Sequence, residues 1–330
     1  MDTTTSFLGS RLPHPFIAGA SPLGFHLDAI KRLEDGGCAA LVIPSLFEEQ
    51  VSLARTGRIH QRDALGAEWA DWIAHFPGAD DYALAPDEYA AHIARVKQAV
   101  AVPVIASLNG STGESWLTFA RIVEQAGADA LELNLYQVVT DLSVPGNVVE
   151  HELISTVNEL KRLLKIPVAV KVSPFFAAFG NVARRLDLAG ADGIVLFNRF
   201  YQPDIDTATM KPTVRLDLST NAELLVRLRW LAILHGRVRP TLVVTGGIAT
   251  PDDGIKALLA GADAVQMVSA ILKQGPAYFT AMREGLERWM GEHGFNQLTE
   301  MRGLASLKQA VDPAAFERAH YIRTLQSWGA

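Results

Sequence analysis

The chain has 330 residues, 49% of them hydrophobic, and a formal net charge of −6. This length suits one large α/β domain or two ordinary ones, and we expect a single domain over residues 1–330. The positive charges are dispersed, which argues against a nucleic-acid-binding protein. The single cysteine, Cys38, rules out a disulfide framework and a cysteine-ligated metal or iron–sulfur site.

The beginning of the chain, MDTTTSFLGSRLPHP, has neither a basic segment nor a long apolar stretch. No apolar window long enough to span a bilayer, about 18 residues, occurs anywhere in the chain. We therefore expect a cytoplasmic protein that does not bind a membrane. The nine histidines are scattered without the i, i+4 spacing of a helical metal site, so we expect no bound metal.

Short, mostly apolar runs follow one another along the chain and are of two kinds that alternate strictly. One kind begins near a proline, and the other begins with a glycine-containing turn of small residues. Each run is too short for a helix, and its apolar character suits a strand that is buried on both faces of a parallel sheet. In chain order the runs cover residues 14–21, 36–45, 102–110, 127–134, 166–174, 190–198, 239–247 and 261–269.

Patterns typical of helices separate these runs. Pro86 and Pro251 suit the first turn of a helix, and acidic residues follow each of them. Eight strands that alternate with eight helices predict a (β/α)8 TIM barrel. A doubly wound open sheet is the alternative, but the count of eight and the regular repeat favour a closed ring. The helical patterns cover residues 27–35, 86–100, 113–126, 147–165, 180–189, 220–235, 251–260 and 275–291.

A bare barrel takes about 250 residues, so this chain must carry additions. We assign them to an N-terminal extension, to insertions at 46–85 and 199–219, and to C-terminal helices beyond residue 293. The insertions follow the second and sixth strands, so they should lie over the C-terminal rim, where barrel enzymes have their active sites. The tail segment PAAFERAHYIRTLQSW predicts a helix packed outside the barrel.

Polar residues at three consecutive strand ends predict a binding site. Lys171 ends the fifth strand, and the alternation of PVAVKVSP puts it on the same face as Ala169. It should point into the barrel mouth as a cation beside a cofactor ring or an anionic substrate; a structural pair with Glu132 and Schiff-base chemistry are the alternatives. Asn134 and Asn198 end the flanking strands. Two amides beside a cation would suit a heterocycle with carbonyl and N–H edges.

The turns that follow strands seven and eight predict a phosphate site. Thr245-Gly246-Gly247 leaves strand seven, and Val268-Ser269 leaves strand eight. Glycine lets backbone N–H groups approach an anion closely, and these two loops commonly hold phosphate in barrels. A tight turn without a ligand is the alternative. The sequence has no G-x-G-x-x-G after a strand and no Walker lysine motif, which argues against a Rossmann site and a P-loop.

Several of these segments form a recognisable series: HPFIAGAS at 14–21, ELNL at 132–135, VKVSP at 170–174, FN at 197–198, TGGI at 245–248 and QMVSA at 266–270. In this order, and over nearly the whole chain, the series resembles the dihydroorotate dehydrogenases, which are FMN-dependent (β/α)8 barrels of pyrimidine biosynthesis. The resemblance is greatest to the soluble branch and to dihydroorotate dehydrogenase-like proteins. It implies an FMN cofactor, a small-molecule substrate and a homodimer.

The resemblance also implies roles for residues. Ala20 and Ser21 should line the flavin, and Lys171 should stabilise the anionic reduced flavin from beside its N1/C2 carbonyl edge. The turns after strands seven and eight should hold the phosphate. In full, we expect FMN to be bound by Ala20, Ser21, Ser45, Asn109, Asn134, Lys171, Asn198, Thr245, Gly246, Gly247, Val268 and Ser269, and the substrate by Asn134, Asn198 and Arg199.

The sequence departs from the family where the substrate should bind. The family has a cysteine or serine base three residues after the fourth-strand asparagine, and here that position is Gln137, a neutral amide that cannot act as a base. The family has an amide two residues after this base, where the present sequence has Val139. It has a lysine at the end of strand two, where Pro44 stands here, and a serine after the sixth-strand asparagine, where Arg199 stands here. The cofactor part is therefore kept, while the orotate part is largely missing.

Other groups could replace the missing ones. Tyr136, Asp141 and Ser143 in the loop after strand four are the candidate catalytic residues, with exposed loop residues of no catalytic role as the alternative. Arg199 could bind a carboxylate bidentately, or bind the phosphate, or face solvent. Cys38 precedes strand two, at the other end of the barrel, and is expected to be structural.

Four hypotheses follow. The first is an FMN-dependent oxidoreductase that acts on a CH–CH bond of a substrate other than dihydroorotate, such as a related cyclic or carboxylated compound. The second is a true dihydroorotate dehydrogenase with a displaced base from residues 136–143. The third is a non-catalytic flavin- or phosphate-binding barrel. The fourth is a flavin-free isomerase or aldolase that uses Lys171 or an acid–base pair.

Overall fold

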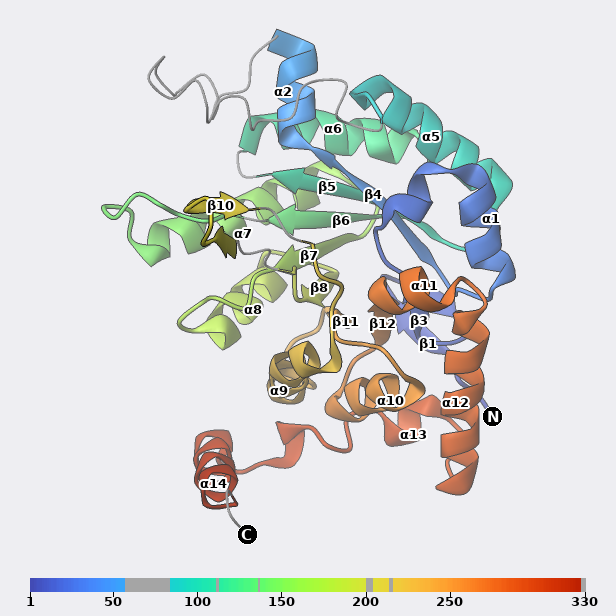
Figure 1. Cartoon of the computed structure of the whole chain (residues 1–330), viewed down its shortest axis with the longest axis vertical. Coiled ribbons are helices and arrows are strands. Elements are labelled where there is room, and N and C mark those ends of the chain that lie inside the picture. Colours follow the sequence, from blue (N-terminus) through green and yellow to red (C-terminus); the bar gives the residue numbers. More distant parts are fainter. Residues whose placement is uncertain (57–83, 111–112, 136, 200–203, 214–215, 328–330) are drawn as a thin grey trace.

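A computed structural model of the chain describes residues 1–56, 84–110, 113–135, 137–199, 204–213 and 216–327. Its centre is a closed barrel of eight parallel strands (Figure 1), which confirms the predicted (β/α)8 fold. The sixth strand pairs with the seventh and the eighth with the first, so the ring has no open edge. In chain order the strands are β3 (Phe16–Ala18), β4 (Leu41–Phe47), β5 (Val104–Gly110), β6 (Ala130–Leu135), β7 (Val168–Val172), β8 (Gly193–Leu196), β11 (Thr241–Thr245) and β12 (Ala264–Met267).

Helices surround this ring, and every predicted helix is present with bounds close to those expected. They are α1 (Leu27–Asp35), α5 (Pro86–Ala99), α6 (Gly113–Gln125), α7 (Gly146–Leu163), α8 (Phe179–Leu188), α9 (Leu224–Leu234), α10 (Pro251–Ala260) and α12 (Tyr278–Glu292). The short 3-10 helix η4 (Asn221–Glu223) lies within the 220–235 pattern, α11 (Ser269–Gln274) begins at the turn that leaves strand eight, and α13 (Leu298–Met301) and η5 (Leu307–Gln309) lie in the segment where C-terminal helices were expected. The sequence patterns did not predict α2 (Glu48–Thr56) or the 3-10 helix η1 (Pro22–Phe25).

The repeated Gly-Ala-Asp segments explain how the two kinds of strand are joined. In each segment the aspartate carboxylate accepts a hydrogen bond from the backbone N–H at the start of a neighbouring proline-preceded strand, where the proline itself has no N–H to offer. The three bonds join Val104 to Asp129 at 2.7 Å, Val168 to Asp192 at 2.7 Å and Leu242 to Asp263 at 2.8 Å. The same polar contact therefore fixes three strand starts around the ring.

The N-terminal extension closes one end of the barrel. It forms an antiparallel hairpin of β1 (Thr5–Phe7) and β2 (Ser10–Leu12). Phe7, Leu8 and Leu12 are buried against alanine, valine and isoleucine residues of the barrel interior. A Cβ on Gly193 would lie 2.7 Å from the Leu8 side chain, so the barrel interior is filled there. In the described part of the chain, this end of the barrel is therefore filled by side chains.

The other additions differ in how much of them is described. The 199–219 insertion contains a hairpin of β9 (Asp204–Asp206) and β10 (Lys211–Thr213), while most of the 46–85 insertion lies outside the described residues. The tail forms α14 (Pro313–Gln326) at the edge of the molecule, as Figure 1 shows. This helix has no buried residue, and an Arg229–Glu317 ion pair of 3.2 Å joins it to α9. No helix in the described ranges has the length and apolarity needed to cross a membrane.

Candidate active site

A cavity of about 390 Å³ opens at the C-terminal ends of the strands. This volume is in the range of small-molecule and cofactor sites. Every residue predicted to bind the cofactor lines it, with the exception of Gly247. These are Ala20, Ser21, Ser45, Asn109, Asn134, Lys171, Asn198, Thr245, Gly246, Val268 and Ser269. Side chains far apart in the sequence are thus brought together at the predicted rim.

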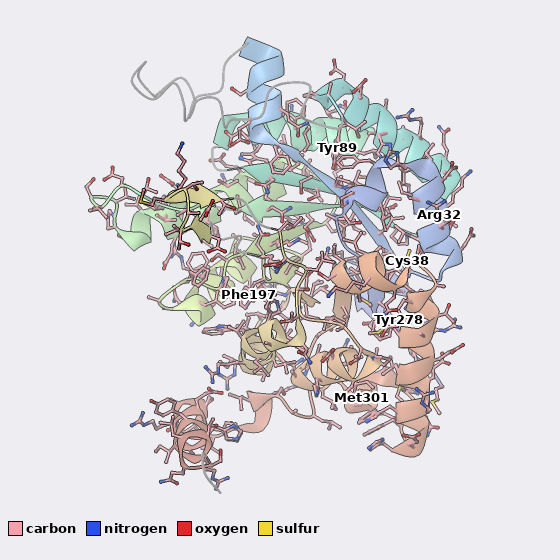
Figure 2. The ribbon with its side chains drawn as sticks, viewed as in Figure 1. Arg32, Cys38, Tyr89, Phe197, Tyr278 and Met301 are labelled. Atoms are coloured by element: carbon pink, nitrogen blue, oxygen red, sulfur yellow. The ribbon has the colours of Figure 1, made fainter. Side chains whose placement is uncertain are left out.

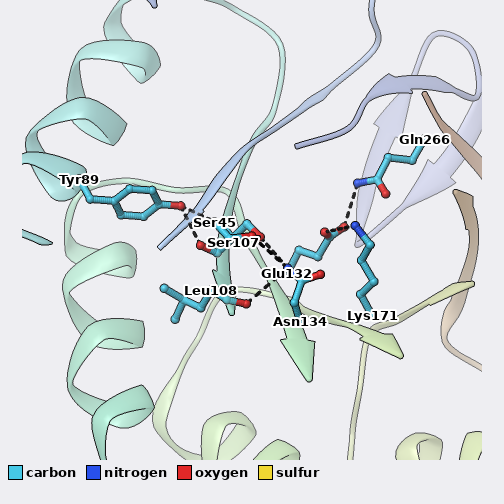
Figure 3. Close-up of polar contacts among 8 residues, drawn as sticks. All are labelled: Ser45, Tyr89, Ser107, Leu108, Glu132, Asn134, Lys171 and Gln266. Carbon is cyan, nitrogen blue, oxygen red and sulfur yellow. Dashed lines mark hydrogen bonds and ion pairs between the residues drawn. The ribbon is translucent and has the colours of Figure 1, made fainter. Parts of the chain in front are cut away.

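The charged part of the cavity floor is built from three strands (Figure 3). Lys171 on β7 lies 3.3 Å from Glu132 on β6, which confirms the predicted pair. Gln266 on β12 donates a hydrogen bond of 2.9 Å to the second oxygen of the same carboxylate. Ala169 faces the barrel interior while Val170 packs outside, as the strand alternation requires. Lys171 therefore points into the mouth of the barrel.

A second polar group fixes the amide of Asn134. Its Nδ2 donates to Ser107 Oγ at 2.8 Å, and Ser107 Oγ lies 2.7 Å from Ser45 Oγ. The backbone register between β4 and β5 shifts just before Ser45, at Pro44, which has no N–H for the ladder. Tyr89 on α5 bonds both strands here, and burial raises the pKa of its hydroxyl. The Asn134 amide oxygen is consequently the atom left to accept a bond from a ligand.

The turn after β11 needs both of its glycines. Gly246 and Gly247 have φ angles of +85° and +80°, in the region that favours glycine. A Cβ on Gly246 would lie 2.7 Å from the guanidinium of Arg227, and one on Gly247 would lie 2.6 Å from the backbone nitrogen of Leu224. Arg227 is buried and donates to the carbonyl of Thr245, and burial lowers the pKa of its guanidinium. Gly247 thus shapes the turn from behind the cavity.

Arg199 also lines the cavity, at its rim. Its guanidinium lies 3.4 Å from the Glu223 carboxylate and donates to the backbone carbonyl of Asp217. Lys171 is the other cation among the lining residues, and it is paired with Glu132. In the described part of the chain, both cations of the cavity therefore already have a carboxylate partner.

The loop after β6 does not contribute its described residues to this cavity. Gln137 is exposed and lines a separate hollow of about 50 Å³ against α7. The Asp141 carboxylate accepts hydrogen bonds from the N–H and hydroxyl of Ser143, at 2.8 and 2.7 Å, and these bonds lower the pKa of Asp141. Both residues are exposed, and Tyr136 lies outside the described residues. The catalytic roles of these three residues remain predictions.

Sequence reasoning missed some residues of the site. Gln266 is 1% exposed and lines the cavity, and its presence in the apolar run DAVQMVS was the signal that could have identified it. Ser107 stands at the end of the third predicted strand but was given no role, and Tyr89, on α5, is marked by no strand-end pattern; both act from beneath the floor. Cys38 is buried between α1 and β4, and burial raises the pKa of its thiol to about 12. Figure 2 shows Cys38 well apart from Phe197, which lines the cavity.

Comparisons with known proteins agree with this geometry. Residues 78–290 match the family model described as dihydroorotate dehydrogenase. The chain is 27% identical, over 92% of its length and 98% of the relative's, to the catalytic subunit of dihydroorotate dehydrogenase B (NAD(+)) from Thermoplasma volcanium. It is 26% identical, over 92% of its length and 77% of the relative's, to the NAD-dependent dihydropyrimidine dehydrogenase subunit PreA from Escherichia coli.

A third relative covers less of the chain. The putative dihydroorotate dehydrogenase A (fumarate) from Aeropyrum pernix is 30% identical over 64% of this chain and 71% of its own length. The family match extends over more than half of the chain and includes β5 to β12, which carry most of the cavity floor and the phosphate-side turns. The chain belongs to the dihydroorotate dehydrogenase family and is an oxidoreductase.

Proposed function

We propose that this protein is an FMN-dependent oxidoreductase that acts on a CH–CH bond of a small cyclic substrate other than dihydroorotate. One observation carries the proposal: the predicted cofactor residues gather around one cavity, whereas Gln137, at the family's base position, lies outside it. Bound FMN would supply hydride transfer, which no side chain can provide. The protein's own residues would bind the ring, hold the phosphate and orient the substrate.

The residues present fit FMN. The turn at Gly246 and Gly247 has positive φ angles and no room for a Cβ, and Gly246 lines the cavity, which suits backbone binding of a phosphate. Gln266 Oε1 is buried without a hydrogen-bond partner among the described residues, and the flavin ring carries an N–H group that such an acceptor needs. Lys171 would place its positive charge beside the ring.

The charges of the cavity support a substrate without a carboxylate. Dihydroorotate is a carboxylate, and a buried carboxylate needs a cation of its own. Lys171 and Arg199, the two cations lining the described cavity, are already paired with Glu132 and Glu223. Pro44 stands where the family has a lysine. An uncharged ring, for which the amides of the cavity offer donors and acceptors, fits better.

Cofactor binding and turnover test the proposal in sequence. We expect the purified protein to be yellow, or to take up FMN with the absorbance spectrum of a bound flavin. Anaerobic addition of uncharged cyclic compounds, one at a time, should then bleach the oxidised flavin band with at least one of them. A colourless protein that takes up no FMN would contradict the proposed cofactor.

Membership of the family favours a second candidate, a dihydroorotate dehydrogenase whose base comes from residues 136–143. Asp141 and Ser143 are bonded to each other outside the cavity, so this function needs the loop to move over it. Complementation of a pyrimidine auxotroph by the well-expressed protein would support this candidate. The family resemblance also supports a homodimer, which light scattering of the purified protein would test.

A further inference from the structure

Glu132 is a buried carboxylate with no role in the proposed function. It is 2% exposed, and its two oxygens have separate partners: Lys171 at 3.3 Å and Gln266 at 2.9 Å. Figure 3 shows the three side chains converging on one another from different strands. Lys171 and Gln266 both line the cavity, so Glu132 lies directly behind two groups that a ligand would contact.

The Glu132–Gln266 bond spans the interior of the barrel. In the ring order, β12 and β6 are separated by β3, β4 and β5 on one side and by β11, β8 and β7 on the other, so they stand opposite each other. Because a carboxylate only accepts hydrogen bonds, the bond fixes the amide of Gln266 with its nitrogen toward Glu132. Gln266 thereby holds Oε2 of Glu132 in place, and Oε1 faces Lys171.

We propose that Glu132, positioned by Gln266, sets the electrostatic field at the cavity floor and so tunes the reduction potential of the flavin. This inference rests on the proposed function, since it takes FMN as the bound group. Glu132 is a positioning residue because it acts through Lys171 and does not itself line the cavity. An ion pair with no net charge stabilises the added negative charge of reduced FMN less than an unpaired lysine would. Glu132 therefore holds the potential down.

Glu132→Gln tests this directly. The amide keeps the size of the carboxylate and one acceptor oxygen, replaces the other oxygen by an NH2 donor that Gln266 can accept if its own amide turns over, and leaves the charge of Lys171 unbalanced. We expect reduced FMN to bind at least about tenfold more tightly relative to oxidised FMN, which is a rise of about 30 mV for a two-electron couple. The measurement is spectroelectrochemical titration of the FMN-loaded protein, with FMN affinity measured separately by fluorescence quenching. A potential that stays unchanged or falls would overturn the inference.

Two further variants separate tuning from packing. Asp129→Asn neutralises the carboxylate paired with Lys97, away from the cavity, so it should leave the potential unchanged, and a shift equal to that of Glu132→Gln would point to a structural effect alone. Glu132→Asp keeps the anion but draws it back from Lys171, so a smaller rise is expected even if Glu132→Gln does not fold. A wild-type protein that binds no FMN would overturn the proposed function as well, whereas FMN-loaded variants with the wild-type potential would overturn only this inference.

Discussion

The two sides of the cavity differ in what holds their residues in place. On the β11 and β12 side, the Gly246 turn is backed by buried Arg227 and by the start of α9, and Gln266 is tied across the barrel to Glu132. On the β6 side, the polypeptide leaves the strand and becomes exposed from Gln137 onward. The former is part of the barrel core, and the latter lies on its surface.

In the proposed function, the packed β11 and β12 side binds the cofactor, and the exposed β6 side meets the substrate. A cofactor common to a family needs fixed contacts, which packed barrel strands provide. Exposed loops tolerate substitution, and changes there alter the substrate without disturbing the fold. Two of the departures from the family pattern, Gln137 and Val139, lie in the exposed loop, and the other two, Pro44 and Arg199, line the cavity beside the predicted cofactor residues.

The largest expected effect on FMN affinity is on the rigid side, at Gly247. Gly247→Ala would force a side chain into a φ of +80° and place its Cβ 2.6 Å from the backbone nitrogen of Leu224. Strain of this kind costs about 1–3 kcal/mol, and the turn would move to relieve it. We expect FMN affinity to fall by about a hundredfold, measured by fluorescence quenching of added FMN.

Gly9→Ala is the matched control. Gly9 has a φ of +77°, but a Cβ there meets nothing within 4 Å. This variant should lose a similar small amount of stability from backbone strain and keep wild-type FMN affinity. Equal loss of FMN from both variants would show that the Gly246-Gly247 turn has no special part in binding.

Lys171→Met should have the next largest effect on FMN affinity, together with a loss of stability. It removes the cation beside the ring and leaves Glu132 buried without its charge partner, and breaking a buried ion pair in this way costs about 3–5 kcal/mol. We expect a lower melting temperature, weaker FMN binding and a lower reduction potential of the FMN that remains. Lys97→Met, which breaks the 2.6 Å pair with Asp129, is the control, and it should leave the potential unchanged.

Acid should affect the closed end of the barrel independently of the cavity. Burial lowers the pKa of His14 from 6.5 to about 4, and its Nδ1 accepts the N–H of Phe16 as a neutral ring. Between pH 6.5 and about pH 4, His14 therefore binds a proton in the unfolded chain but stays neutral in the folded chain. Stability should fall across this window by up to about 3 kcal/mol from this residue. Denaturant titrations at pH 7 and 4.5 would measure the fall, and His14→Gln should reduce it.

The smallest effect is expected on the exposed side, at Asp141. Its carboxylate is bonded to Ser143 outside the cavity, and the same bonds lower its pKa, which makes it a weaker base. Asp141→Asn should change the turnover number by less than about threefold, because removal of a true general base costs about a hundredfold or more. A hundredfold loss, seen in steady-state assays with any substrate found, would favour the displaced-base candidate.

The sequence predicted the barrel well because its signals are local and repeated. Alternating apolar runs and Gly-Ala-Asp turns specify eight strands, and strand ends must meet at one rim once the ring closes. Lys171 and its pair with Glu132 followed from the alternation of neighbouring strands alone.

What the sequence did not reveal depends on contacts between distant segments. The bond between Gln266 and Glu132 joins residues on opposite strands, and Gly247 acts through the start of α9, a contact that no local pattern encodes. The exposed course of the loop after β6 likewise depends on packing that the motif does not specify. The helix α14 was predicted, but its lack of buried residues was not.

The contrast between the two sides is tested most directly by one anaerobic titration of the FMN-loaded protein. Dihydroorotate carries a carboxylate that dihydrouracil lacks. The two cations that line the described cavity, Lys171 and Arg199, are already paired with Glu132 and Glu223. We expect the oxidised flavin band to persist when dihydroorotate is added and to bleach when dihydrouracil, the uncharged ring, is added. Rapid bleaching by dihydroorotate, with dihydrouracil inert, would contradict the view that the cofactor side is kept while the substrate side has changed.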